Sequence, residues 1–211
     1  MQKQQVASAS SPRKEEVMSP LEGLLLTFVS ATPSRWDAFN TISGIQWRDG
    51  APVKNDDASD AQSAYYRRGT LMLAGFGLVD VPDGGQGADQ GTKQANEGNA
   101  GITLNGDANK VYSIAVQKFY ASEDYRRILA NQLTPSDTVS VVADQCQLDF
   151  GTTSTNTLGN QFFLLNLSAG KVYVEAYADD GAESHGPGAT TFIFYQTKPM
   201  QRIAAMQCKE S

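Results

Sequence analysis

The chain has 211 residues, of which 40% are hydrophobic and 19% are charged, so it can bury a sizeable core as one domain. With 17 basic and 23 acidic residues it carries a net charge of −6, which gives no general attraction to the phosphates of nucleic acid or of anionic lipid. Two cysteines and one histidine are too few for the usual zinc sites. We therefore expect no nucleic-acid partner and no zinc centre.

Residues 1–18 are polar and are expected to form a flexible leader ahead of a single domain at 19–211. The apolar run at 24–29 is far shorter than the roughly 20 residues that cross a membrane, so no transmembrane segment is predicted. A polar leader of this kind is typical of the tether that follows the lipidated cysteine of bacterial lipoproteins. A lipid tether is therefore one hypothesis, and an ordinary cytosolic N-terminus is the alternative.

Three helices are predicted from capping signals and apolar spacing. The first begins at Ser19 and Pro20, because serine caps a helix and proline suits the first helical position, and Glu22 completes a capping box. Its buried face is expected to carry Leu21, Leu24, Leu25 and Phe28. A short helix at 35–40 would bury Trp36 and Phe39, and a third helix at 122–133 would bury Tyr125, Ile128 and Leu129.

Extended segments bounded by turn residues make up most of the remaining chain. Besides the hairpin described next, predicted strands lie at 45–48, 65–81, 102–104, 110–120, 137–143, 191–196 and 201–208, and the last of these could end as a helix. Asn105, Gly106 and Asp107 predict a hairpin turn, with Asn-Gly as its strongest signal. The segment 83–101 is rich in glycine and poor in apolar side chains, so a mobile loop is expected there.

The clearest hairpin runs from Gln161 to Asp180, with a turn at 168–170. Alternation places two sets of side chains on one buried face: Phe163, Leu165 and Leu167 from the first strand, and Val172, Val174, Ala176 and Ala178 from the second. The opposite face carries Tyr173, Glu175 and Tyr177, a mixture typical of a sheet that meets water or a partner. The fold class expected from these elements is α+β, a mostly antiparallel sheet of about seven strands with two or three helices packed on one face.

Cys146 and Cys208 are predicted to form a disulfide, because both lie among polar neighbours where a buried thiol is less natural. Closing the chain between them would stabilise the fold by roughly 4 kcal/mol through loop entropy. A disulfide in turn indicates an oxidising compartment. Two unrelated free thiols are the alternative.

The polar segment 179–188 contains the chemically richest group of side chains: Asp179, Asp180, Glu183 and His185. His185 is the one side chain whose ordinary pKa suits a general base near neutrality, but the adjacent Ser184 does not make it a catalytic pair. The three carboxylates could bind calcium, although a solvated glycine-rich turn explains them as well. We predict no catalytic residue, no metal and no cofactor, and take Asp179, Asp180, Glu183, His185, Tyr173 and Tyr177 as candidate binding residues.

The function favoured by elimination is that of a non-enzymatic binding protein, periplasmic or attached to the outer membrane, with a cytoplasmic location as the alternative. Acidic small domains of this kind often act as inhibitors or immunity proteins that block a cationic enzyme, such as a cell-wall hydrolase, and the segments 83–101 and 179–188 are the candidate inserting elements. A small-molecule or glycan-binding module that stacks ligands on Trp36, Trp47, Tyr173 and Tyr177 is the first alternative. A hydrolase that uses His185 is the second.

Overall fold

The computed structural model describes residues 18–30, 34–72, 99–119, 124–148, 157–179 and 188–209, and the statements below refer to these residues. Most of the predicted leader and of the glycine-rich segment 83–101 lies outside them. The described residues form an α+β fold dominated by an antiparallel sheet, as the sequence predicts.

The helices are short and the strands are numerous. The helices are α1 (Pro20–Ser30), α3 (Tyr125–Ala130) and α4 (Met200–Ala204), with 3-10 turns η1 (Trp36–Phe39) and η2 (Ala61–Ser63). The strands are β1 (Ile45–Trp47), β2 (Val53–Lys54), β3 (Tyr65–Met72), β4 (Asn99–Gly106), β5 (Val111–Phe119), β6 (Thr138–Leu148), β7 (Thr157–Leu167), β8 (Gly170–Asp179), β9 (Ala189–Tyr195) and β10 (Met206–Lys209).

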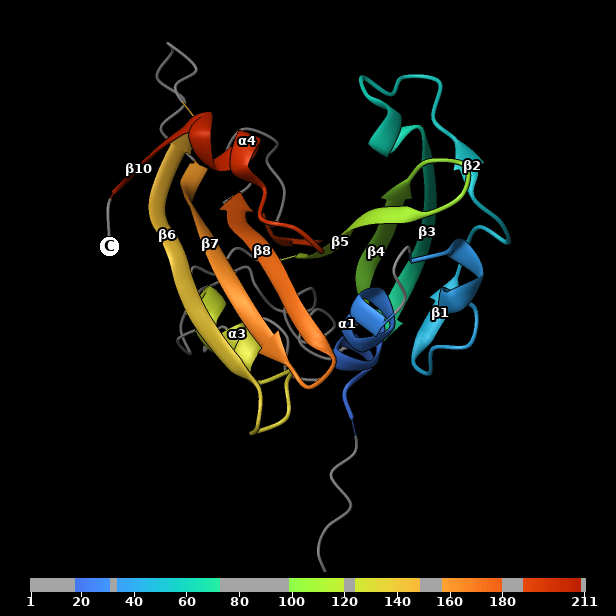
Figure 1. Ribbon diagram of the computed structural model, residues 1–211, viewed down its shortest axis with the longest axis horizontal. Helices are drawn as coiled ribbons and strands as arrows, with labels where there is room; N and C mark the ends of the chain where they lie inside the picture. Colours follow the sequence, from blue (N-terminus) through green and yellow to red (C-terminus); the bar gives the residue numbers. More distant parts are fainter. Residues whose placement is uncertain are drawn as a thin grey trace, which may run out of the picture.

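These strands form one sheet in the order β1-β3-β4-β5-β9-β8-β7-β6-β10, and β2 also pairs with β3. Strand β9 lies in the middle, between β5 and β8, although it comes late in the chain. The sheet bends around α1, so that β6 to β8 stand on one side of this helix and β3 and β4 on the other (Figure 1). Helix α1 accordingly contacts both β8 and β3.

The main core lies on the face of the sheet that α1 and α3 cover, which we call the inner face. The predicted buried face of the β7–β8 hairpin is confirmed, since all seven of its apolar side chains are buried there. Phe192 and Phe194 of β9 continue this core toward β5 and β4. Phe192 also packs edge-on against Tyr125 of α3, with ring centroids 6.0 Å apart. Alternation along the strands therefore predicts the inner face correctly.

Helix α1 begins as its capping residues predict. The Ser19 hydroxyl oxygen accepts a hydrogen bond from the Glu22 backbone N–H at 3.0 Å, and Pro20 is the first helical residue. The apolar stripe of the helix is fully buried. The Glu22 carboxyl is also buried, at 3% exposed, and interacts with Thr134 and Asp137 in the connection between α3 and β6.

Burial raises the pKa of Glu22 above its ordinary value of 4.5; the charge of Asp137 adds to the rise and a hydrogen bond with Thr134 opposes it. The protonated form is thus favoured in the folded state, and the stability it contributes is present below pH 4.5 and lost as the pH rises through the folded pKa. We expect Glu22→Gln to raise the free energy of unfolding at pH 7, with no gain below pH 4.5. Urea unfolding at several pH values measures this. The exposed Asp37→Asn is the control, and a gain independent of pH would contradict the assignment.

The β4–β5 turn comprises residues 107–110, so it includes the predicted turn residue Asp107, whereas Asn105 and Gly106 belong to β4. Asp107 organises the turn by accepting hydrogen bonds from the backbone N–H groups of Asn109 and Lys110, at 2.7 and 3.0 Å. Glycine is required at position 106 because there is no space for a side chain. A Cβ atom at this position would overlap the Lys110 carbonyl oxygen and lie 2.8 Å from the Trp36 ring.

Gly106→Ala is expected to lower the free energy of unfolding by about 2 kcal/mol, because the added methyl group must displace backbone as well as an indole ring. Gly50→Ala is a matched control, since a Cβ at Gly50 meets nothing within 4 Å. Chemical denaturation of both variants compares the two sites. Equal stability of the two variants would contradict the close approach at Gly106.

Several features differ from the predictions. The described residues hold ten strands rather than about seven. Strand β2, which has only two residues, lies outside every predicted strand, whereas β1 and β10 overlap the predicted strands 45–48 and 201–208. β4 begins at Asn99, within the segment predicted as a loop, and Ala100 is buried in the core. At the C-terminus the helix α4 precedes the strand β10 rather than following it, and it lies on the opposite face from α1 and α3. No described helix is long and apolar enough to span a bilayer.

Candidate functional site

The face opposite the main core, which we call the outer face, carries three tyrosines on β8 and β9. Tyr173 lies directly across from Tyr195, and Tyr177 lies further along β8 on the same face. All three side chains are half-buried. No hydrogen bond from the hydroxyls of Tyr173 and Tyr177 is formed within the described residues. We call Tyr173, Tyr177 and Tyr195 the tyrosine face.

Glu175 lies between Tyr173 and Tyr177 and is fully buried, at 0% exposed. Its carboxylate accepts two hydrogen bonds from the Arg202 guanidinium of α4, at 2.7 and 3.1 Å. It accepts two more, from the Asn160 amide at 2.8 Å and from the Tyr195 hydroxyl at 3.2 Å. A carboxylate with four donors has its hydrogen-bonding capacity filled, and we assign it the role of fixing α4 to the outer face.

The electrostatics of this cluster agree with a fixed ion pair. The hydrogen bond to Glu175 raises the pKa of Arg202 above its ordinary value, so the guanidinium stays charged. Burial, and the negative charge of Glu175, raise the pKa of Tyr195 well above 10.0. Tyr195 is therefore a neutral hydrogen-bond donor near neutral pH and does not act as a base.

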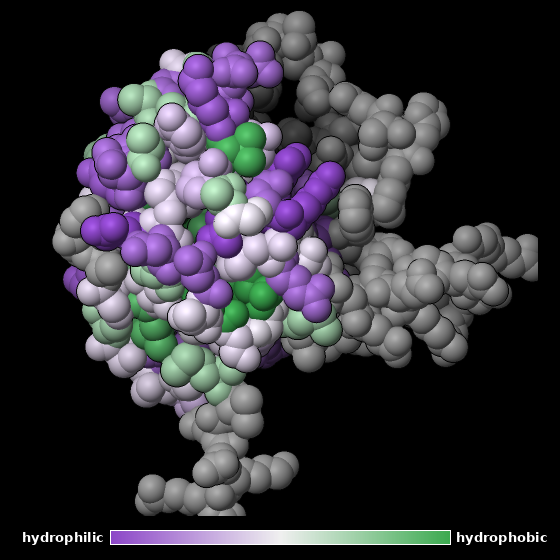
Figure 2. Space-filling view, turned by 90° about the vertical axis from the view of Figure 1, so that its right-hand side faces the viewer, coloured by the Kyte–Doolittle hydropathy of each residue, from purple (hydrophilic) through white to green (hydrophobic). Residues whose placement is uncertain are grey.

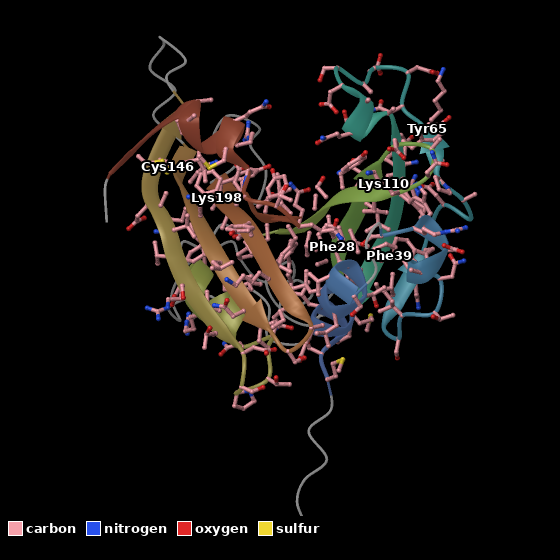
Figure 3. All side chains as sticks on the ribbon, in the orientation of Figure 1. Phe28, Phe39, Tyr65, Lys110, Cys146 and Lys198 are labelled. Atoms are coloured by element: carbon pink, nitrogen blue, oxygen red, sulfur yellow. A yellow bond between two sulfur atoms is a disulfide. The ribbon has the colours of Figure 1, made fainter. Side chains whose placement is uncertain are left out.

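The predicted disulfide is present between Cys146 at the end of β6 and Cys208 of β10. It lies beside a second, smaller core on the outer face, formed by Ala143, Cys146, Phe162 and Met206 with Val142, Ile203 and Cys208 around them. Figure 3 shows the two sulfur atoms beside the labelled Cys146, next to α4. The bond is consistent with an oxidising compartment. Together with Glu175 it attaches the C-terminal segment to the sheet.

The structure places the predicted binding residues unevenly. Tyr173 and Tyr177 share the outer face, and Asp179 is the last residue of β8, paired with Thr157 and Ala189. The remaining three, Asp180, Glu183 and His185, lie outside the described residues, so their roles stay predictions. Sequence reasoning missed Glu175, Tyr195, Asn160 and Arg202 as a group, because their partners are far apart in the chain.

The strands before and after the two predicted inserting segments, 83–101 and 179–188, meet at one end of the sheet. Met72 pairs with Asn99, and Asp179 pairs with Ala189, which in turn pairs with Phe119. Since these pairs lie on neighbouring strands of one sheet, the chain enters and leaves both segments at the same end of the sheet. Tyr177 is the member of the tyrosine face nearest this end.

The two tryptophans lie apart from the tyrosines. Trp47 is on the edge strand β1, where its indole N–H donates to the Phe39 carbonyl and the Arg67 guanidinium lies 4.4 Å from its ring centroid. Trp36 is 7% exposed, and its indole N–H donates to the Asp107 carbonyl. The four aromatic residues predicted to stack a ligand thus do not form one surface.

A pocket of about 530 Å³ lies beside Trp36 and is lined by Arg35, Trp36, Asp37, Pro52, Ala108 and Asn109. The side of the molecule over β1 to β3 is otherwise mainly hydrophilic, with small and separate hydrophobic patches among the coloured residues (Figure 2). Within the part of the chain that the structure describes, no three histidine, cysteine, aspartate or glutamate side chains are grouped to hold a metal ion.

Comparisons of the chain with known protein families, with curated proteins and with solved structures found no match.

Proposed function

We propose that the protein is a non-enzymatic binding domain of an oxidising compartment that contacts a protein partner through the tyrosine face. The observation that carries the proposal is this group of half-buried tyrosines on two neighbouring strands. Tyrosine is enriched at protein interfaces because it combines a large apolar ring with a hydrogen-bonding hydroxyl at a small cost in conformational entropy. The rigid sheet holds the rings in place before a partner arrives.

The partner that fits this chain is basic. A net charge of −6 favours encounter with a cationic protein and disfavours nucleic acid or anionic lipid surfaces. The disulfide supports a location outside the cytosol, and we take the periplasm or the outer membrane as the proposed location. The proposed kind of partner is therefore a cell-wall hydrolase. The activity that follows is inhibition, of the kind that inhibitor and immunity proteins exert.

The test measures binding to, and inhibition of, a panel of purified basic peptidoglycan hydrolases. We expect one of them to form an equimolar complex whose peptidoglycan-cleaving activity is blocked. Tyr177→Ala should weaken this complex by at least tenfold, as expected for a central interface tyrosine.

Tyr66→Ala is the control for this experiment, because Tyr66 is a half-buried tyrosine on β3, several strands away. It should leave the affinity unchanged. Absence of binding across the panel, or equal effects of the two substitutions, would contradict the proposal.

The pocket beside Trp36 favours a second candidate, a small polar ligand such as a saccharide. Its volume lies within the range of ordinary ligand sites, and its lining combines an indole and a proline with charged and amide groups. Quenching or enhancement of tryptophan fluorescence across a saccharide panel separates this candidate from protein binding, since Trp36 belongs to the main core and the tyrosine face lies on the outer face.

A further inference from the structure

Strand β6 has an open edge along its first half. It pairs with β7 on one side, but β10 reaches it on the other side only from Asp144 to Leu148. The preceding run, Thr138–Val141, has no strand against its outer edge among the described residues. Figure 1 shows β6 as the outermost long strand on its side of the molecule, with β10 meeting only one end of it.

The side chains of this run leave the edge accessible. Thr138, Ser140 and Val141 are exposed, and Val141 has 41% of its surface open to solvent. Apart from the pairing with β7 and a side-chain bond between Asn166 and Thr138, no hydrogen bond involves these residues in the described part of the chain. Backbone N–H and C=O groups that face outward here therefore have no hydrogen-bond partner among the described residues.

The composition of the run suits strand pairing. Threonine, valine, serine and valine carry no charge, and the run contains no proline. Charged side chains and proline are the residues with which proteins usually block such an edge. The C-terminal end of the run is closed by two features. A bulge at Val142 interrupts the register with β7, and β10 covers the edge beyond it. The open edge is thus short and has defined limits.

We propose that this edge binds an extended segment of a basic partner protein, which adds to the sheet as an extra strand. A second copy of this chain is a poorer occupant, because two copies each carry a charge of −6 and repel each other. Asp137 directly precedes the run and carries a negative charge. The partner segment that fits this edge therefore has uncharged β-branched residues at its centre and a lysine or arginine beside them. This inference goes beyond the tyrosine face and does not depend on it.

The test uses a synthetic peptide of the sequence Lys-Thr-Val-Thr-Val-Thr-Val-Lys and amide hydrogen exchange of the whole protein. We expect exchange to slow at least tenfold at those amides of residues 138–141 that do not bond to β7. The same peptide with N-methyl groups on alternate residues keeps the charge and side chains but cannot form the ladder, and it should give no protection.

Ser140→Lys should weaken peptide binding at least tenfold by placing a charge on the edge, whereas Ser168→Lys adds the same charge in the exposed β7–β8 turn and should leave binding unchanged. Thermal unfolding verifies that both variants are folded. Equal binding of the N-methylated peptide would overturn the proposal, as would protection that rises with protein concentration in the absence of peptide, which would identify a second copy as the occupant.

Discussion

Replacing both Cys146 and Cys208 by serine is expected to lower the free energy of unfolding by about 4 kcal/mol, which is a large fraction of the total stability of a typical domain. The two cysteines are 62 residues apart in the chain, so the disulfide removes a large loop entropy from the unfolded state. The core around them would remain apolar, because Phe162 and Met206 pack beside the sulfur atoms. Urea unfolding of the oxidised protein and of the double variant measures the difference.

The reduced wild-type protein is the internal control for this experiment, since it has lost the cross-link but keeps the cysteine side chains. It should unfold at nearly the same urea concentration as the double serine variant. A double variant as stable as the oxidised protein would show that β10 is held by its packing alone. In that case the disulfide would contribute little to the fold.

Arg202→Met is expected to lower the free energy of unfolding by about 3 kcal/mol, because it leaves the Glu175 carboxylate buried without its cationic partner. We place the effect at the low end of the range for buried ion pairs because the Arg202 side chain is 45% exposed and water can partly replace it. The double variant that combines Glu175→Met with Arg202→Met should regain most of the lost free energy of unfolding. A methionine pair needs no charge compensation.

The double-mutant cycle distinguishes an ion pair from simple packing of α4. If the losses from the two single substitutions add up in the double variant, the two side chains do not act together and the assigned role of Glu175 is wrong. Lys54→Met in the exposed pair with Asp56 is a matched control, and it should change the stability little because both of its side chains are largely exposed.

Much of the fold follows from local sequence patterns. The inner face of β7 and β8, the start of α1 at Ser19 and the buried side of α3 all depend on residues within a few positions of one another. Alternation and capping report such short-range relations directly. The disulfide is also predicted correctly from the polar sequence neighbours of both cysteines, although the structure buries Cys146 in the smaller apolar core.

The outer face could not be predicted in the same way. Glu175 sits between two tyrosines in a pattern typical of a solvated strand, and only the return of α4 onto this face buries it. Its partner Arg202 is on a five-residue helix with no capping signal, and Asn160 reaches it across the β7–β8 pair. Contacts between such distant residues depend on how the helices and strands pack together. The spacing of apolar residues along one helix or strand does not predict them.

The central position of β9 has a consequence for how the chain folds. While the ribosome or a translocon still holds residues 189–195, the strands β3 to β5 and the strands β6 to β8 can form only two separate sheets, each with an open inner edge. Phe192 and Phe194, which join the two halves of the core, become available only after the strands of both sheets. The protein should therefore complete its fold only once β9 has joined the two sheets, at the slow rate typical of distant strand pairings.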